Sequence, residues 1–238
     1  MTDLPFARPV SLLVLALLLV ACSNTAEEKR IAKLLPEEAS FRELSVCSGS
    51  GCAYRHPVRL GAGDWAMIDA LFGVPPADPA EERRRIALAV GIMEILVGHQ
   101  AGTRHDVGRN ASVRDQSQQL DCVDEAVNTT TYLRLFEDRG LLRWHQVGLP
   151  ANRLLDLVDA HNTAVVTDTT SGIAYAVDSW FYDNGAPAMV LPLTAWRNGW
   201  DPADGDRRPP DPATGPAPSQ TASEERDGRI TRAEAAIR

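Results

Sequence analysis

The chain has little of several features that mark common functional classes. Of its 238 residues, 24 are Lys or Arg and 32 are Asp or Glu, so the formal net charge is -8. This deficit of basic residues argues against sequence-independent nucleic-acid binding, which requires clustered Lys and Arg. The sequence also contains no phosphate-cradling glycine loop and no internal repeat. We therefore expect no nucleic-acid partner and no repeat architecture.

A hydrophobic run long enough to span a membrane is also missing. Residues 10–20 are mostly apolar, but a spanning helix needs about 20 residues, so their length fits a signal peptide instead. The run ends in Leu-Val-Ala-Cys at positions 19–22, which resembles the lipobox of bacterial lipoproteins. The resemblance implies a lipoprotein signal peptide over residues 1–21, a lipid on Cys22, and membrane anchoring in the bacterial cell envelope, facing the periplasm. A plain signal peptide and an uncleaved anchor are the alternatives.

The rest of the chain divides by composition into three parts. Residues 22–40 are polar and charged and are predicted to be a tether. Residues 201–238 are rich in Pro, Gly and charged residues, have few large apolar ones, and are predicted to be a disordered tail. Residues 41–200 remain, and this length is sufficient for one domain with its own core.

Cysteines are few, and three of the four can be explained without chemistry. Cys22 belongs to the lipobox, and Cys47 and Cys52 bracket a Ser-Gly-Ser-Gly linker that lets the chain reverse. Exported proteins form disulfides, so these two are predicted to be paired. A zinc site there would need two further ligands, and His56 is the only nearby candidate. Cys122 is left over, either reactive or an inert buried side chain.

Hydrophobic periodicity places Cys122 at the start of a helix. Apolar residues recur at helical spacing over 64–72 and 79–98, and again from Cys122 to Phe136. Free amides and the dipole at a helix N-terminus favour a thiolate, the nucleophilic form of cysteine. The charges of Asp121 and Asp124 oppose this effect, although Asp121 can instead cap the helix.

Downstream of this helix the pattern changes to alternation typical of strands, predicted at residues 141–148, 161–168, 173–181 and 188–191. A four-residue turn that pairs Asp168 with Ile173 puts Thr163 opposite Asp178. His161 then lies two residues further along the same face, about 7–8 Å from Asp178 on a diagonal that side chains can close. A slip of one residue would separate them.

A helix that begins with Cys, a strand that begins with His and a neighbouring strand that carries Asp resemble the core of transglutaminase-like and papain-like cysteine enzymes, including the bacterial transglutaminase-like cysteine peptidases. The resemblance covers about residues 116–192 and includes Asp-Cys-x-Asp-x-Ala at positions 121–126. It implies an α+β fold in which the nucleophile-bearing helix packs on an antiparallel sheet.

The same resemblance implies a role for each residue. Cys122 is the nucleophile, His161 the base and Asp178 the residue that orients the imidazole. Gln116 is the candidate oxyanion donor, with Gln119 as an alternative. The expected substrate is an amide of a protein or a peptidoglycan peptide, and no cofactor is expected.

Other interpretations remain open. Trp180, Phe181 and Trp196 are expected to cover the sheet, with a cleft wall as the alternative. A non-catalytic binding module and a structural lipoprotein are the alternatives to an enzyme. Asp168 or Asn184 could take the place of Asp178 in the triad. A metal site could form from His99, His105 and Asp106, although these residues lack a regular ligand spacing.

Overall fold

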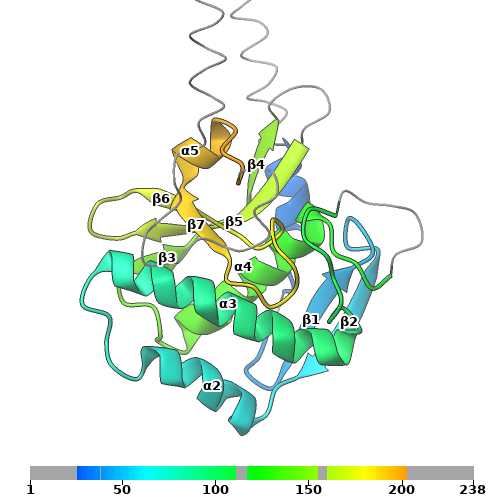
Figure 1. The fold of residues 1–238 in the computed structure, drawn as a ribbon, viewed down its shortest axis with the longest axis horizontal. Coiled ribbons are helices and arrows are strands. Elements are labelled where there is room, and N and C mark those ends of the chain that lie inside the picture. The colour runs from blue at the N-terminus through cyan, green and yellow to red at the C-terminus, as the bar shows by residue number, and fades with distance from the viewer. Residues whose placement is uncertain (1–25, 38, 111–116, 155–159, 203–238) are drawn as a thin grey trace, which may run out of the picture.

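The structure is a computed structural model that describes residues 26–37, 39–110, 117–154 and 160–202 (Figure 1). It is α+β, with antiparallel sheets, as predicted. The N-terminal half contains β1 (Glu43–Ser48), β2 (Tyr54–Arg59), α2 (Ala62–Phe72) and α3 (Pro79–Ala101). The C-terminal half contains α4 (Cys122–Asp138), β3 (His145–Val147), β4 (Ala151–Leu154), β5 (Ala160–Asp168), β6 (Ala174–Asp178), β7 (Met189–Pro192) and α5 (Leu193–Arg197).

The described residues form two sheets, and the larger one carries the predicted register. β1 and β2 make a separate hairpin, while the five-stranded sheet has the order β3-β5-β6-β7, with β4 also paired to β5. In the β5–β6 ladder, Ala164 faces Val177 and Thr167 faces Ala174. This alignment confirms the register predicted from the turn at residues 169–172, and it brings the start of β5 level with the end of β6.

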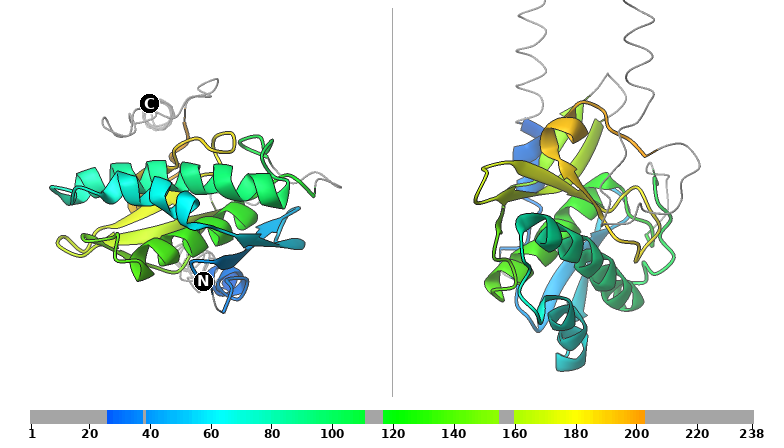
Figure 2. Two further views of the ribbon diagram at one scale, coloured as in Figure 1. Left: turned by 90° about the horizontal axis from the view of Figure 1, so that it is seen from below. Right: turned by 60° about the vertical axis from the view of Figure 1, so that its left-hand side comes forward.

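The five-stranded sheet is covered on both faces, so alternate residues of β5 enter different cores. Ala164 and Val166 pack in the main core with side chains of α2, α3 and α4. Val165 points to the opposite face, where it joins a second cluster that includes Phe181 and Trp196. Figure 2 shows α3 and α4 running along the layer formed by the strands. Burial on both faces fixes the register, because a one-residue slip would exchange the two sets.

Helix ends are set by local sequence. Asp78 caps α3 by accepting a hydrogen bond from the Glu81 amide at 2.7 Å, with Pro79 in the first turn. The helix continues past Gly98, where the sequence predicts its end, and stops at Gly102, which has a φ of 82°. Glycine adopts this left-handed conformation at little cost, so it terminates the helix.

Strand β4 is absent from the predicted elements. It is only four residues long, follows Pro150 and contains Asn152 and Arg153, so it lacks an apolar alternation. Its stability comes from pairing with the first residues of β5, where Asn152 faces Asn162. A strand held by tertiary pairing leaves little signal in the sequence.

The segment predicted to be a tether is packed where the structure describes it. Residues 26–32 are helical, and Ile31 and Leu35 are buried against Val123 and Val127 of α4. Apolar side chains at this spacing give the segment a face that the domain covers.

The described helices include none that is long and apolar enough to cross a membrane. The signal peptide, Cys22 and nearly all of the predicted tail lie outside the described residues.

Candidate active site

Cys122 is the first residue of α4, as the sequence predicts. Asp121 caps the helix by accepting hydrogen bonds from the amides of Val123 and Asp124 at 3.0 and 2.9 Å. The Cys122 thiol is free and partly exposed. The thiol therefore lies at the positive end of the helix dipole, where a small molecule can reach it.

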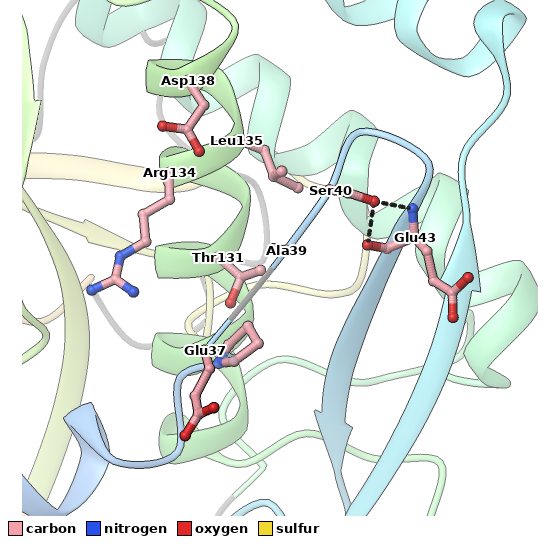
Figure 3. Close-up of a pocket in the computed structure, with 9 residues that line it drawn as sticks. Glu37, Ala39, Ser40, Glu43, Thr131, Arg134, Leu135 and Asp138 are labelled. Carbon is pink, nitrogen blue, oxygen red and sulfur yellow. Dashed lines mark hydrogen bonds between the residues drawn. The ribbon is translucent and has the colours of Figure 1, made fainter.

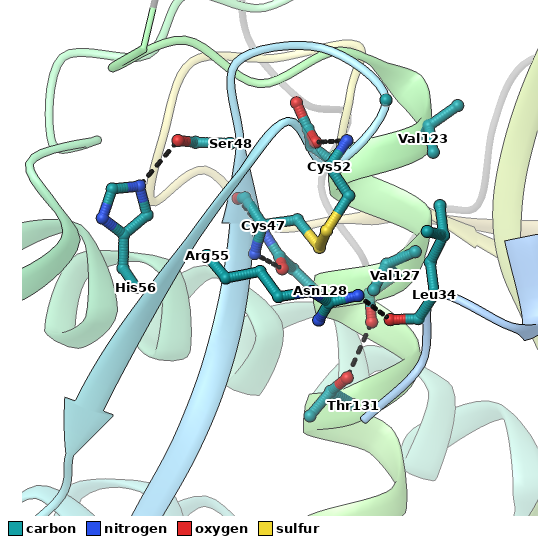
Figure 4. Close-up of a disulfide and its surroundings, with 12 residues drawn as sticks. Leu34, Cys47, Ser48, Cys52, Arg55, His56, Val123, Val127, Asn128 and Thr131 are labelled. Atoms are coloured by element: carbon teal, nitrogen blue, oxygen red, sulfur yellow. Dashed lines mark hydrogen bonds between the residues drawn. A yellow bond between two sulfur atoms is a disulfide. The ribbon is translucent and has the colours of Figure 1, made fainter. Parts of the chain in front are cut away.

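The predicted disulfide between Cys47 and Cys52 is present and holds a loop against the start of α4 (Figure 4). The amides of Ser50 and Cys52 donate to the Asp124 carboxylate at 2.8 and 2.7 Å. Burial and the neighbouring Asp121 charge raise the pKa of the Asp124 carboxyl to about 7. The loop therefore supplies the hydrogen bonds that this buried carboxyl group needs.

His161 and Asp178 form the contact that the register predicts. His161 Nε2 lies 2.8 Å from Asp178 Oδ2, and both side chains are almost fully buried. Two further donors hold the same carboxylate, the Trp196 indole at 2.7 Å and the Trp180 amide at 3.2 Å. Three hydrogen bonds thus hold the Asp178 carboxylate in place. Because Asp178 engages Nε2 of His161, only Nδ1 of the imidazole can interact with another partner.

The surroundings of His161 favour the imidazolium. Burial by itself would lower the pKa of His161, but the charge and hydrogen bond of Asp178 outweigh burial, and a hydrogen bond and charge interaction with Cys122 add to them. Together they raise the pKa of His161 to about 9. At neutral pH the ring therefore carries a positive charge beside the sulfur.

Aromatic rings enclose this imidazole. The His161 ring lies 4.6 Å from Trp180, 5.3 Å from Phe181 and 5.5 Å from Trp196, measured between centroids. These three residues cover the face of the sheet opposite the main core, as predicted. They also exclude water from the His161–Asp178 pair. Exclusion of water strengthens the electrostatic interaction between the two side chains.

Asn162 is a site residue that the sequence analysis missed. Its Nδ2 donates to Cys122 Sγ at 3.5 Å, while its Oδ1 accepts from Asn152 Nδ2 at 2.9 Å. The second contact fixes which end of the Asn162 amide faces the sulfur. No local signal identifies this role, because it depends on Asn152 in β4, the strand that the sequence does not reveal.

Buried carboxyl groups lie behind the site. Ser179, the residue after Asp178, donates to Glu125 of α4 at 2.6 Å, and the Gly185 amide donates to Glu94 of α3 at 2.9 Å. Burial raises the pKa of Glu94 to about 8 and that of Asp106 to about 7, and it raises the pKa of Glu125 well above its ordinary value. These groups are therefore largely protonated at mildly acidic pH, which makes their burial tolerable.

The alternative residues for the Asp178 position lie elsewhere. Asp168 is at the opposite end of β5 from His161 and caps the following turn, where hydrogen bonds from Thr170 and Ser171 hold the pKa of its carboxyl far below the usual range. The backbone amide of Asn184 donates to the Asp106 carbonyl in another loop.

Of the oxyanion candidates, Gln116 lies outside the described residues. Gln119 has both ends of its amide engaged within its own loop: Nε2 donates to the His105 carbonyl at 2.9 Å, and Oε1 accepts from the Val107 amide at 3.1 Å and Asn110 at 3.2 Å. Gln119 therefore organises the loop before α4.

One group of potential metal ligands converges within the described ranges. Its members are Cys47, Cys52 and Asp124, and the disulfide engages both sulfurs. His105 accepts a hydrogen bond from Arg104 at 2.9 Å, and His56 bonds to Ser48 at 2.8 Å.

A separate surface pocket lies toward the other end of α4 (Figure 3). Its lining includes Glu37, Glu43 and Asp138 around a single cation, Arg134. The first α4 residue to reach it, Thr131, is about 14 Å from Cys122 along the helix axis, at 1.5 Å per residue. The pocket is therefore distinct from the thiol site.

A comparison with protein-family models, curated proteins and solved structures finds no match for this chain.

Proposed function

We propose that the protein is a cysteine hydrolase or acyltransferase that acts on an amide bond through Cys122, His161 and Asp178. The observation that carries this proposal is the 2.8 Å contact between buried His161 and Asp178 beside a free, partly exposed thiol at a helix N-terminus. The order of elements, with a nucleophile helix followed by the His and Asp strands, supports a core of the transglutaminase-like or papain-like kind.

The positions of these groups suggest a mechanism. The Cys122 thiolate attacks the carbonyl carbon of the amide, and the His161 imidazolium gives a proton to the departing amine. The resulting thioester then passes its acyl group to water or to a second amine. Asp178 keeps the imidazole oriented and stabilises its positive charge.

Asn162 is the side-chain donor that we assign to the developing oxyanion. Its amide already points at Cys122 Sγ and is held by Asn152 from behind. The Cys122 backbone amide, at the start of α4, is the second donor. One such donor contributes roughly 3–4 kcal/mol in related acyl-transfer chemistry.

The cellular setting rests on the lipobox resemblance. We propose that a lipid on Cys22 anchors the protein to a membrane of the bacterial cell envelope, facing the periplasm, where proteins and peptidoglycan peptides supply the amide substrates. Incorporation of a clickable fatty acid into the wild type, and its loss in Cys22→Ser, is the expected result. Equal labelling of the two proteins would contradict the anchor.

Capture of an acyl-enzyme tests the chemistry. The full chain is incubated with the 4-nitrophenyl ester of N-acetylalanine, quenched in acid, and mapped by mass spectrometry for an acyl group on Cys122. We expect a hydroxylamine-labile adduct that is lost in Cys122→Ser and strongly reduced in His161→Ala.

His145→Ala is the matched control, because His145 forms an equally buried contact with Glu82 at 2.9 Å in another part of the sheet. The control should keep the adduct. No adduct in the wild type, or equal amounts in the two histidine variants, would refute the proposed function.

A further inference from the structure

The N-terminal helical segment, residues 26–32, lies against the thiol site. Ile31 and Leu34 pack in a cluster with Val123 that also contains the partly buried Cys122. Hydrogen bonds to Glu27 raise the pKa of Arg30, and the charges of Asp121 and Cys122 raise it further. Figure 1 shows this segment, in blue, next to the start of α4.

From this segment, Glu28 extends a carboxylate to two donors. Its Oε1 accepts from the backbone amide of Asn152 at 3.2 Å and from the Arg197 guanidinium at 2.8 Å. The two donors come from β4 and the end of α5, and they converge on one oxygen. An amide on a strand and a guanidinium are the groups that proteins use to bind carboxylates.

A chain of contacts connects this carboxylate position to the reacting sulfur. Asn152 faces Asn162 in the β4–β5 ladder, where directly opposed residues lie about 4.5–5.5 Å apart. Asn162 in turn contacts Cys122 Sγ. From the Glu28 carboxylate through the Asn152 amide, across the strand pair and from Asn162 to the sulfur, the path is roughly 12 Å long. About three extended residues of a bound peptide cover that distance.

We propose that the Asn152 amide and the Arg197 guanidinium form a carboxylate-binding subsite beside Cys122, which Glu28 fills in this structure and which a carboxylate-bearing peptide substrate fills during turnover. The inference rests on the proposed function. It defines the substrate class as peptides with a carboxylate about three residues from the scissile amide. That group is either a chain-terminal carboxylate or an acidic side chain.

The subsite makes the N-terminal segment an internal competitor of the substrate. Removing the Glu28 charge should open the subsite without touching the triad. Glu27→Gln is the matched control, because Glu27 lies on the same helix, carries the same charge and pairs with Arg30 at 2.7 Å instead of with Arg197.

A test that does not depend on the thiol uses phenylglyoxal, which modifies accessible arginines. The full chain and its Glu28→Gln and Glu27→Gln variants are treated and mapped for modification of Arg197. We expect phenylglyoxal to modify Arg197 faster in Glu28→Gln than in the wild type or in Glu27→Gln. In Glu28→Gln, N-acetylglycine should slow this modification about tenfold, the effect of one charge-assisted hydrogen bond, and N-acetylglycinamide should not slow it. Equal modification of the two variants, or equal protection by the two probes, would overturn the subsite.

N-acetylaspartic acid α-amide, which presents its carboxylate on a side chain, distinguishes the two sources. Protection by N-acetylglycine alone assigns the subsite to chain-terminal carboxylates, and protection by the aspartate probe alone assigns it to acidic side chains.

A second test connects the subsite to Cys122. Alkylation rates at Cys122 are compared for N-iodoacetyltriglycine, whose three residues span the distance to the subsite, and its neutral analogue N-iodoacetyltriglycinamide. The ratio of acid to amide rates should rise about tenfold in Glu28→Gln and return to the wild-type value in Glu28→Gln/Arg197→Gln. An unchanged ratio would contradict a link between the subsite and the thiol. Slow reaction of both reagents, indifferent to His161→Ala, would instead refute the proposed function, while the phenylglyoxal result would still decide the subsite.

Discussion

Replacing Asp178 by Asn should remove the positive charge of His161 at neutral pH. The pKa of His161 is raised to about 9 although burial opposes the charge, and Asp178 provides the largest opposing contribution. With a neutral partner, burial should bring the pKa to 6.5 or below. At pH 7.5 the imidazolium population then falls from about 97% to at most about 9%, close to tenfold.

The same substitution has a stability consequence with a definite sign. Because the folded-state pKa of His161 exceeds its ordinary value of 6.5, the His161–Asp178 pair contributes its full stability below pH 6.5 and loses it as the pH rises through about 9. Asp178→Asn should therefore destabilise the protein most at acidic to neutral pH. The difference from the wild type should shrink above pH 9.

Nuclear magnetic resonance titration of the histidine ring protons, with His161 assigned by its loss in His161→Ala, measures the shift. Cys122 alkylation at pH 7.5 should fall about tenfold in parallel. Asp168→Asn is the matched control, because Asp168 is a buried carboxylate at the other end of β5. A His161 pKa that is the same in Asp178→Asn as in the wild type would refute the reasoning.

Three further predictions concern stability and are checked by urea denaturation. Replacing both Cys47 and Cys52 by Ser should lower the free energy of unfolding by about 2 kcal/mol, the entropy that closing so short a loop removes from the unfolded chain. An unchanged urea midpoint would contradict a stabilising disulfide. Burial raises the pKa of Glu94 to about 8, so the stability that the protonated Glu94 carboxyl contributes is complete below pH 4.5 and is lost as the pH rises through 8. Glu94→Gln should therefore lose less stability than the wild type between pH 5 and 8. Parallel stability profiles of the two proteins over this range would refute the prediction. Gly91→Ala should lower the free energy of unfolding by about 1–3 kcal/mol, because the new Cβ would lie 2.8 Å from the Ala186 carbonyl oxygen. Gly63→Ala should raise it by about 0.5–1 kcal/mol, because no atom lies within 4 Å of the new Cβ. The opposite ranking would be inconsistent with the packing of α3.

The sequence was sufficient for the parts of the site that local rules determine. A capping aspartate before Cys122 placed the thiol in the first turn of α4, and a four-residue turn fixed the β5–β6 register that joins His161 to Asp178. Alternation and turn length are short-range properties, so one sequence carries them.

The missed parts depend on pairing between distant segments. Asn162 gains its orientation from Asn152, and Asn152 lies in a strand that exists only through its pairing with β5. Glu28 likewise meets Arg197 across most of the chain, from a segment whose composition predicted a tether. Contacts of this kind follow from the tertiary structure and leave no periodic pattern.

The pH dependence of Cys122 alkylation tests the central claim most directly. Iodoacetamide is reacted with the full chain and with His161→Ala from pH 5.5 to 9, and the Cys122 peptide is quantified. An ordinary thiol, with a pKa of about 8.5, slows about tenfold for each pH unit below that value. We predict that wild-type Cys122 stays reactive well below this range and that His161→Ala restores the ordinary profile. A wild-type rate that follows the ordinary profile, unchanged by His161→Ala, would contradict a nucleophile–base pair.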